Sequence, residues 1–400
     1  MLLIKKEQIQ QILRKRNRTF SSVEKTVSKI ISDVERNGDN AVKRWTQKLD
    51  KISVNKIQVS DDEILLSLKK ILPQDKTVIN KAIKRITKYH KKQHISSFTM
   101  QEDGLSIKFR TKPVDRAGLY IPAGSAPLIS TTLMTSIPAK VANVGEIIAC
   151  SPPTHKGSIH PYIIGCLSML GIKKIFKIGG SQAIAAMAFG TESVPKVNVI
   201  AGPGNIYVNA AKKLVSGIVG IDILAGPSEL VVMADNSVNI DFVSADLNAQ
   251  AEHKYSVVFF LCTDNNIGNK VSKKVKNGYW MKISNLEDGI KIINDIAPEH
   301  LQIICKNARS IAEKCVAGAI FIGNYTPCAI GDYIAGPSHT LPTGSTAAFD
   351  SGLSVFDFIR TYAIMEANST FFKKNGIISE RLAEIENLFK HRDSLKIRRL

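Results

Sequence analysis

A carboxylate and an imidazole stand side by side at Glu299 and His300, in the segment DIAPEHLQII. Such a pair suits a reaction with two different proton transfers, because each group can accept or release a proton near neutral pH. Adjacent residues of an extended segment point to opposite sides, but at a turn after Pro298 both can face one cavity. The alternative is structural: Glu299 caps a helix or faces solvent, and His300 hydrogen-bonds a backbone carbonyl. Residue types alone leave both interpretations open.

A second candidate lies in the alanine-rich segment ADLNAQAEHKY, whose composition favours a helix. Gln250 and His253, at positions i and i+3, would share one face of that helix. The two side chains could bind a metal, although glutamine is a weak oxygen ligand that proteins seldom use. An ordinary solvated helix face is the alternative, and the spacing is compatible with both.

A third candidate is the Gly/Ser/Thr/Pro-rich stretch that begins IGDYIAGPSHTLPTGS and carries Asp332, Tyr333 and His339. Long ordered loops of this composition are often binding loops. Two glycine turns, KIGGSQAI and IAGPGNIYV, place small residues where backbone N–H groups and a helix N-terminus favour an anion such as a pyrophosphate. Neither turn matches G-x-G-x-x-G, so nucleotide binding and an ordinary strand-to-helix turn both stay open.

The elements that must position these residues alternate along the chain from about residue 117. Buried strands are predicted in EIIACSPP, KKIFKIGG, KVNVIAGPGN, GIDILAGPSELVVMAD, SVVFFLCTD, HLQIIC and AGAIFIG, with helices between most of them. This alternation predicts an α/β fold with parallel, doubly wound sheets. The first hundred residues are predicted to be helical. The last thirty form a polar helical tail with too little apolar surface for its own core, so it should dock on its own chain or on a partner.

Composition excludes several classes of function. The net charge of +19 suggests an anionic partner, but the basic residues are spread among acidic ones and aromatics make up only 6%. Nucleic-acid binding is therefore not expected. The six cysteines form no C-x-x-C pair, which predicts reduced thiols in a cytoplasmic protein. The charged N-terminal segment does not resemble a secretory signal, and no apolar run approaches the roughly 18 residues of a membrane span.

Taken together, the ordered motifs closely resemble the histidinol dehydrogenase family. The resemblance runs from about residue 115 to 370 and resumes near AEIENLFKH, and it rests on GLYIPAGSAP, GGSQAIAAMAFG, AGPGNIYV, AGPSE, ADLNAQAEH, IAPEHLQI and GDYIAGPSHTLPTGSTAAFDSGLSVFDF. The family's fold implies two incomplete, doubly wound Rossmann-like domains, with a helical N-terminal region and a helical C-terminal tail. The implied division is a first domain of residues 1–116 and 229–370, an inserted NAD-binding domain of residues 117–228, and a tail of residues 371–400.

The resemblance also implies an activity. Family members oxidise L-histidinol through L-histidinal to L-histidine, the last steps of histidine biosynthesis, and use NAD and one zinc ion (Zn2+) per subunit. They are homodimers in which the tail of one subunit reaches the site of the other. A paralogous dehydrogenase of another small polar alcohol, such as a sulfonated diol, is the alternative within this fold. A basic binding protein that has lost its chemistry is the alternative outside it.

Matching motif to motif carries the family's functional residues onto this chain. The acid/base pair becomes Glu299 and His300. The zinc ligands become Gln250, His253, Asp332 and His391. These four and His300 also contact the substrate, together with Ser228, His339 and Glu386. The NAD contacts become Tyr120, Gln182 and Asn205.

The chain departs from the family pattern at four places. Lys254, Cys328 and Ser338 replace residues more usual in the family. The segment between residues 263 and 295 also looks shorter than usual, by about one helix and one strand. None of these departures removes a proposed ligand or catalytic group, so the sequence predicts an active enzyme.

Overall fold

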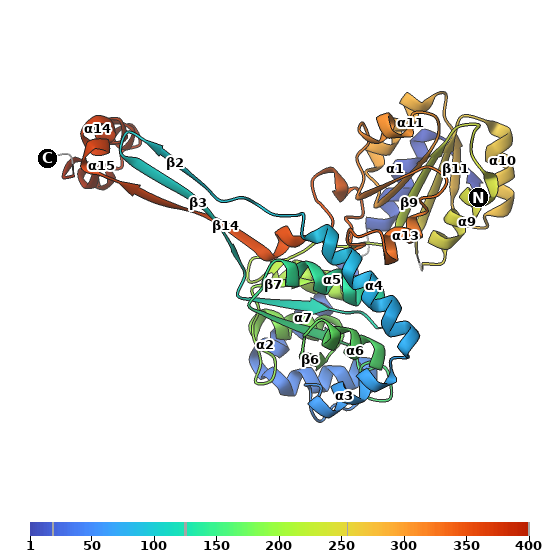
Figure 1. The fold of residues 1–400 in the computed structure, drawn as a ribbon, viewed down its shortest axis with the longest axis horizontal. Coiled ribbons are helices and arrows are strands. Elements are labelled where there is room, and N and C mark those ends of the chain that lie inside the picture. The colour runs from blue at the N-terminus through green and yellow to red at the C-terminus, as the bar shows by residue number, and fades with distance from the viewer. Residues whose placement is uncertain (18–19, 124–125, 254, 399–400) are drawn as a thin grey trace. The chain divides into compact units, whose positions relative to one another are not determined.

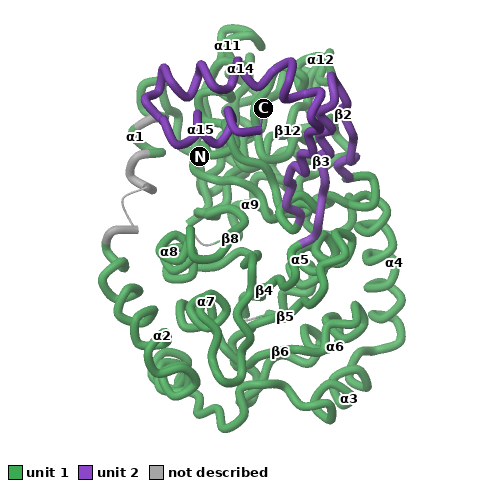
Figure 2. The backbone as a smooth tube through the Cα atoms, turned by 90° about the vertical axis from the view of Figure 1, so that its left-hand side faces the viewer, with its two compact units in different colours: residues 1–93, 114–358 green, residues 94–113, 359–400 purple. Residues whose placement is uncertain are grey.

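The computed structural model describes residues 1–17, 20–123, 126–253 and 255–398. They form two compact units, shown in Figure 2. Unit 1 contains residues 1–93 and 114–358, and unit 2 contains residues 94–113 and 359–400. The prediction of an α/β fold with parallel sheets is confirmed, because unit 1 contains two sheets whose strand pairs are all parallel. Among the described residues, no helix combines the length and apolar character that crossing a membrane requires.

The first sheet of unit 1 has the strand order β6-β5-β4-β7-β8. Its strands are β4 (Arg116–Tyr120), β5 (Glu146–Ser151), β6 (Lys174–Lys177), β7 (Val199–Ala201) and β8 (Gly220–Ile221). Its connecting helices are α5 (Ile129–Val141), α6 (Pro161–Met169), α7 (Gly180–Phe189) and α8 (Ile206–Val215). The chain builds outward from β4 on one side and then returns to add β7 on the other. The carboxyl ends of β4 and β7 therefore form a topological switch point, where open α/β sheets bind ligands.

The N-terminal helices α2 (Phe20–Asp50), α3 (Asp61–Lys70) and α4 (Pro73–His90) accompany this first sheet. The apolar face of α2, with Val27, Ile30 and Val34, shares one core with Ile184 of α7 and Val208 of α8. Residues 1–116 were predicted to form one domain with residues 229–370. The contacts of α2 run instead to residues 117–228, because its amphipathic face has its apolar partners there.

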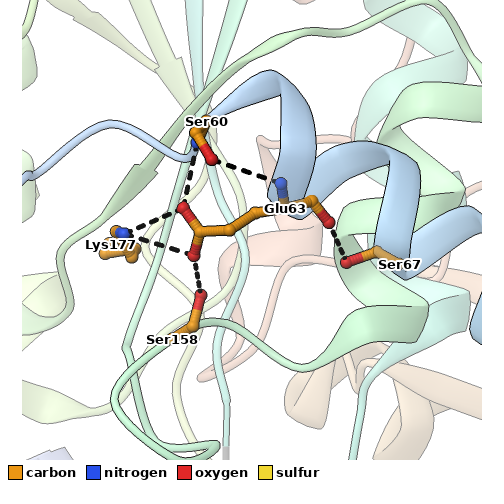
Figure 3. Close-up of polar contacts among 5 residues, drawn as sticks. All are labelled: Ser60, Glu63, Ser67, Ser158 and Lys177. Atoms are coloured by element: carbon orange, nitrogen blue, oxygen red, sulfur yellow. Dashed lines mark hydrogen bonds and ion pairs between the residues drawn. The ribbon is translucent and has the colours of Figure 1, made fainter.

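A capping network anchors the start of α3 to this sheet (Figure 3). Ser60 Oγ accepts from Glu63 N (3.2 Å), and Ser60 N donates to Glu63 Oε2 (3.0 Å), a reciprocal capping box. The same carboxylate accepts from Ser158 Oγ (2.8 Å) and pairs with Lys177 Nζ of β6 (3.1 Å). None of these elements carries a predicted site residue, so the network is structural.

The second sheet of unit 1 has the order β1-β11-β10-β9-β12-β13. Its strands are β1 (Leu2–Leu3), β9 (Glu229–Ala234), β10 (Val257–Cys262), β11 (Tyr279–Lys282), β12 (His300–Ile304) and β13 (Ala319–Ile322). Its helices are α1 (Lys6–Asn17), α9 (Ile240–Ala251), α10 (Asn265–Lys274), α11 (Leu286–Ile296), α12 (Ala308–Ala312) and α13 (Cys328–Tyr333), followed by the 3-10 helices η1 (Thr346–Ala348) and η2 (Val355–Phe358). Helices cover both faces of this sheet (Figure 1).

Alternate residues of the central strand β9 face opposite sides of this sheet, as a period of two requires. Val231 and Met233 pack in one core with residues of α1 and α11, whereas Leu230 and Val232 pack in the other with residues of α9 and α10. The segment expected to lack a helix and a strand contains α10, β11 and most of α11, and β11 lies between β1 and β10. This segment therefore supplies a strand and helices of the second sheet.

Unit 2 is an antiparallel sheet followed by two helices. Its strands are β2 (Phe98–Glu102), β3 (Leu105–Pro113) and β14 (Ile359–Ala367), in the order β14-β3-β2, and its helices are α14 (Ser369–Ile385) and α15 (Phe389–Lys396). The helical tail was predicted, but β2 and β3 were not. All five residues of β2 are exposed, so this strand lacks the buried-and-polar alternation by which a half-buried strand is recognised in a sequence.

Candidate active site

The predicted acid/base pair lies at the amino end of β12. Ala297 ends α11 in a left-handed conformation (φ 43°), and the chain turns through Pro298 into the strand. Glu299 and His300 are both buried, with 7% and 5% of their surface exposed. His300 is in register with Leu230 of β9, so Glu299 lies beside Glu229. Buried carboxylates are rare unless they are paired or hydrogen-bonded, so the contacts of these residues decide their role.

The two glutamates hold each other by reciprocal bonds from side chain to backbone. Glu229 N donates to Glu299 Oε2 (2.8 Å), and Glu299 N donates to Glu229 Oε2 (3.3 Å). The second oxygen of Glu229, Oε1, accepts from Gly344 N (2.7 Å). Among the described residues, no hydrogen bond is recorded at Glu299 Oε1. That oxygen is the one with which Glu299 can act on a ligand.

The contacts of His300 select one tautomer. Its Nδ1 lies 3.1 Å from the backbone carbonyl oxygen of Glu229 and 3.4 Å from Glu299 Oε2. Both oxygens act as acceptors, so Nδ1 carries the hydrogen and, in the neutral ring, Nε2 is the nitrogen that can take a proton. The backbone contact expected for a purely structural histidine is therefore present, but it occupies only one ring nitrogen.

Electrostatics keeps the His300 ring charged. Burial by itself lowers the pKa of His300, but the charge and hydrogen bond of Glu299, the charge of Asp332 and the carbonyl of Glu229 together raise it to about 9. A carboxylate within hydrogen-bonding range favours the protonated imidazole. At neutral pH the His300 ring is therefore mostly imidazolium.

Gln250 and His253 reach the same edge of the sheet because of the direction of α9. Strand β9 runs away from the edge that carries Glu229 and Glu299, and α9 returns along the sheet, so its last turn arrives back at that edge. Gln250 is buried, and His253, just beyond the helix, is exposed. Asp332 of α13 is close enough for the charges of His300, His339 and His253 to lower its pKa, although burial is the larger effect and raises it.

Gln250, His253 and Asp332 carry an amide, an imidazole and a carboxylate, which are donor types that zinc accepts. Zinc binds four ligands in a closed site. Across the described ranges, no group of three or more His, Cys, Asp and Glu residues lies together as a metal site. The fourth predicted ligand, His391, is an exposed residue of α15 in unit 2, and Glu386 is exposed just after α14. The donor set in unit 1 is chemically suited to zinc but is one ligand short.

His339 and Ser228 flank these groups. His339 Nδ1 lies 3.0 Å from the Asp332 carbonyl oxygen, and its Nε2 lies 3.2 Å from Thr131 Oγ1 in the first turn of α5. Through His339, the loop after α13 is therefore attached to the first turn of α5. Ser228, half-buried, directly precedes Glu229, and its carbonyl accepts from Val257 N (2.9 Å).

The predicted nucleotide contacts gather at the carboxyl edge of the first sheet. Tyr120 ends β4, and its hydroxyl accepts from Gly180 N (3.1 Å). Asn205 is exposed and caps α8, accepting from Tyr207 N and Val208 N. Gln182 is fully buried in the first turn of α7, as Tyr120 is buried at the end of β4, and its Nε2 lies 3.5 Å from Asp50 Oδ2. Asn205 is thus the exposed one of the three predicted NAD contacts, whereas the side chains of Tyr120 and Gln182 are buried.

A buried ion pair shapes the turn beside Tyr120. Lys212 and Asp222, both with fully buried side chains, form a salt bridge. Lys212 Nζ also donates to Gly202 O (3.2 Å), and Asp222 Oδ2 accepts from Gly202 N (2.7 Å). Gly202 has a φ of +126°, and a Cβ there would lie 2.1 Å from the Tyr120 carbonyl oxygen. The turn from β7 into α8 is thus held close against β4, which suits a dinucleotide phosphate at the α8 N-terminus.

Two functional candidates escaped the sequence analysis. Glu229 was not predicted, although a carboxylate at the start of the apolar strand ELVVMA is a usable signal. Gln302 of β12 is fully buried and donates to Asp246 Oδ2 of α9 (2.7 Å). No local pattern connects those two positions.

Two of the residues that depart from the family pattern, Cys328 and Ser338, are buried and have local structural roles. Cys328 is buried at the start of α13, and burial raises the pKa of its thiol well above the usual range, so it is a packing residue. Ser338 is buried, and its hydroxyl accepts from Thr340 N (3.2 Å). Lys254 lies outside the described residues.

Comparison with known proteins agrees with this arrangement. The sequence model of the family described as Histidinol dehydrogenase matches residues 13–399. A protein named histidinol dehydrogenase from Prochlorococcus marinus (strain MIT 9312) is 41% identical, with 98% of this chain and 95% of that protein covered. One of the same name from Saccharolobus solfataricus is also 41% identical, with 95% and 96% covered. Among solved structures, the crystal structure of histidinol dehydrogenase from Elizabethkingia anophelis has a TM-score of 0.89 at 36% identity, covering 94% of this chain and 92% of that one.

Proposed function

The chain belongs to the histidinol dehydrogenase family, and we propose that it oxidises L-histidinol through L-histidinal to L-histidine with two NAD and one bound zinc ion. Members of this family are NAD-dependent, zinc-binding oxidoreductases of histidine biosynthesis. The observation that carries the proposal is the buried pair Glu299 and His300, which lies on the same sheet edge as Gln250 and His253. Two proton-accepting groups beside a set of zinc donors are what two successive oxidations at one carbon require.

The zinc ligands would be Gln250, His253 and Asp332 of one subunit and His391 of the partner subunit. Zinc bound there supplies a template that fixes the imidazole and amino nitrogens of the substrate. Ser228, His339 and Glu386 would complete the substrate contacts. This assignment is supported by the donor types in unit 1 and by the electrostatic proximity of Asp332 to His253 and His300.

The protein groups would divide the proton transfers between them. In the first oxidation, neutral His300 takes the alcohol proton on Nε2 while the carbinol hydride passes to NAD+, giving L-histidinal and NADH. In the second, Glu299 Oε1 takes a proton from the water that adds to the aldehyde, and the hydrate passes its hydride to the second NAD+. Support for the division comes from the fixed tautomer of His300 and from the recorded contacts at Glu299, which involve Oε2.

NAD would bind at the switch point of the first sheet, with its phosphates at the N-terminus of α8 and with Tyr120, Asn205 and Gln182 as nearby residues. Support comes from the closely packed Gly202 turn. Gln182 would have to act from within the first turn of α7, where its side chain is buried beside Asp50. The substitution Gln182→Ala therefore tests fold and NAD affinity together.

A homodimer with exchanged tails is supported by an exposed apolar face on α14. Ile377, Ile378, Leu382 and Ile385 are each exposed by 56–62%. Apolar residues gathered on one helix in this way usually contact a partner. The tail 371–400 and the NAD-binding domain 117–228 are proposed as the family's functional divisions. The six cysteines are all unpaired, which supports a cytoplasmic location.

Purified protein loaded with zinc should form two NADH for each L-histidinol consumed, and chelation should abolish this until zinc is restored. The stoichiometry follows from two oxidations at one site, and the metal dependence from the template role of zinc. NADH absorbance and the L-histidine produced are the measurements. No turnover by the zinc-loaded protein would contradict the proposal, and NADH formation from a sulfonated diol instead would identify the paralogous activity.

The first oxidation should speed up as the pH is raised. Because the His300 pKa lies at about 9, most of the protein carries imidazolium at pH 7, and the unprotonated base becomes more abundant as the pH rises through 9. The profile of kcat/KM for L-histidinol should therefore rise from pH 7 and level off near this pKa. A value of kcat/KM that no longer rises above pH 7 would show that His300 is not the base.

A further inference from the structure

Glu229 is the point at which the parts of the site meet. One carboxylate oxygen accepts from Glu299 N (3.3 Å) and the other from Gly344 N (2.7 Å). Its backbone N–H donates to Glu299 Oε2 (2.8 Å), and its carbonyl lies 3.1 Å from His300 Nδ1. Only 2% of its surface is exposed. A single residue thus contacts both catalytic candidates and the loop that follows His339.

The loop is attached to the start of β9 at a second place. Gly226 lies three residues before Glu229, and its backbone N donates to Thr343 Oγ1. Gly318, just before β13, lies close to both Glu299 and the loop, because a Cβ there would lie 2.7 Å from the Glu299 carbonyl oxygen and 3.2 Å from Pro342 Cδ. Two hydrogen bonds therefore join residues 343–344 to the start of β9, and Gly318 lies between Pro342 and the Glu299 backbone.

We propose that Glu229 is a positioning residue that joins Glu299, His300 and the 341–344 segment into one rigid unit, and thereby sets the geometry of both oxidations. The inference rests on the proposed function of Glu299 and His300. Glu229 itself takes no part in proton transfer: its oxygens are held by Glu299 N and Gly344 N. The Glu229 carboxylate holds the Glu299 backbone N–H, and the Glu229 N–H holds Glu299 Oε2. The Glu229 carbonyl is the acceptor that fixes the His300 tautomer.

The substitution Glu229→Gln provides the test. One oxygen becomes an amide NH2, which cannot accept from Glu299 N or Gly344 N, so one charge-assisted bond is replaced by two donors facing each other. The expected loss in kcat is about 10- to 100-fold with L-histidinol and about the same with L-histidinal. The KM for L-histidinol should stay within about threefold, since Glu229 does not touch the substrate. Equal loss in both half-reactions is the signature of a residue that positions both groups.

Glu63→Gln is the matched control. Glu63 is also a carboxylate with several backbone and side-chain donors, but it anchors α3 (Figure 3). This variant should lower the melting temperature and leave kcat for both substrates unchanged. Should Glu229→Gln fail to fold, Thr343→Val removes the acceptor of Gly226 N and should lower kcat for both substrates by about 3- to 10-fold.

Three experimental results would overturn either the positioning role of Glu229 or the proposed function. Folded Glu229→Gln, or Thr343→Val in its place, with wild-type kcat on both substrates overturns the positioning role. Glu229→Gln that loses only L-histidinal oxidation overturns it as well, since the residue would then serve Glu299 alone. Wild-type protein that forms no NADH from L-histidinol refutes the proposed function instead, and this is measured before any variant.

Discussion

Replacing His300 with alanine should slow the oxidation of L-histidinol by about 10²- to 10⁴-fold and affect L-histidinal oxidation much less. Replacing Glu299 with glutamine should give the opposite pattern, with the larger loss on L-histidinal. The reason is that an alcohol must give up its own proton as hydride leaves, whereas an aldehyde must first gain water. Within the described part of the chain, the contacts of these two side chains involve His300 Nδ1 and Glu299 Oε2, so we assign the proton transfers to His300 Nε2 and Glu299 Oε1.

Half-reactions measured separately provide the test. L-Histidinol and L-histidinal are each supplied with NAD+, and NADH formation is followed before and after the steady state. Zinc content and circular dichroism of each variant serve as controls, because both side chains are buried and their removal can disturb the fold. Equal losses on the two substrates in both variants would contradict the division of labour. That pattern is instead expected of Glu229→Gln, so the three variants together separate transfer of protons from positioning.

Two inactive variants, His253→Ala and His391→Ala, should regain activity when they are mixed and allowed to exchange subunits. Each variant alone lacks one zinc ligand, and its activity should fall by about 100-fold or more. In a mixed dimer with exchanged tails, one site combines the intact His253 of one subunit with His391 of the partner subunit. Half of the dimers formed at random are mixed, and each carries one complete site, so about a quarter of wild-type activity should return.

The recovery distinguishes ligation between subunits from ligation within one. If His391 bound the zinc of its own chain, each site in a mixed dimer would lack one ligand and mixing would restore nothing. The matched control mixes His253→Ala with Gln250→Ala, both altered in unit 1, which should not complement by either route. Bound zinc, measured in parallel, should rise in step with the recovered activity.

Much of the fold could be predicted from local patterns. Apolar segments such as HLQIIC and ELVVMA, each bounded by turn residues and followed by a helix, are sufficient to predict strands of a parallel sheet. The spacing of Gln250 and His253 and the adjacency of Glu299 and His300 marked them as candidates, and the resemblance to a known family assigned their roles. Strands β2 and β3 were not predicted, because β2 is exposed throughout and β3 is half-buried on both faces, so neither shows an alternating burial pattern.

What the sequence determined by itself was which residue types could do chemistry and which elements carry them. Only the tertiary structure decided how those groups are oriented. Glu229 and Glu299 are 70 positions apart, and they pair because β9 and β12 are neighbours in a register that places His300 opposite Leu230 and so Glu299 beside Glu229. The same register sets the Glu229 carbonyl against His300 Nδ1 and leaves Nε2 as the base. Local propensity cannot encode these contacts, since they depend on strand order and register, which the packing of the whole sheet determines.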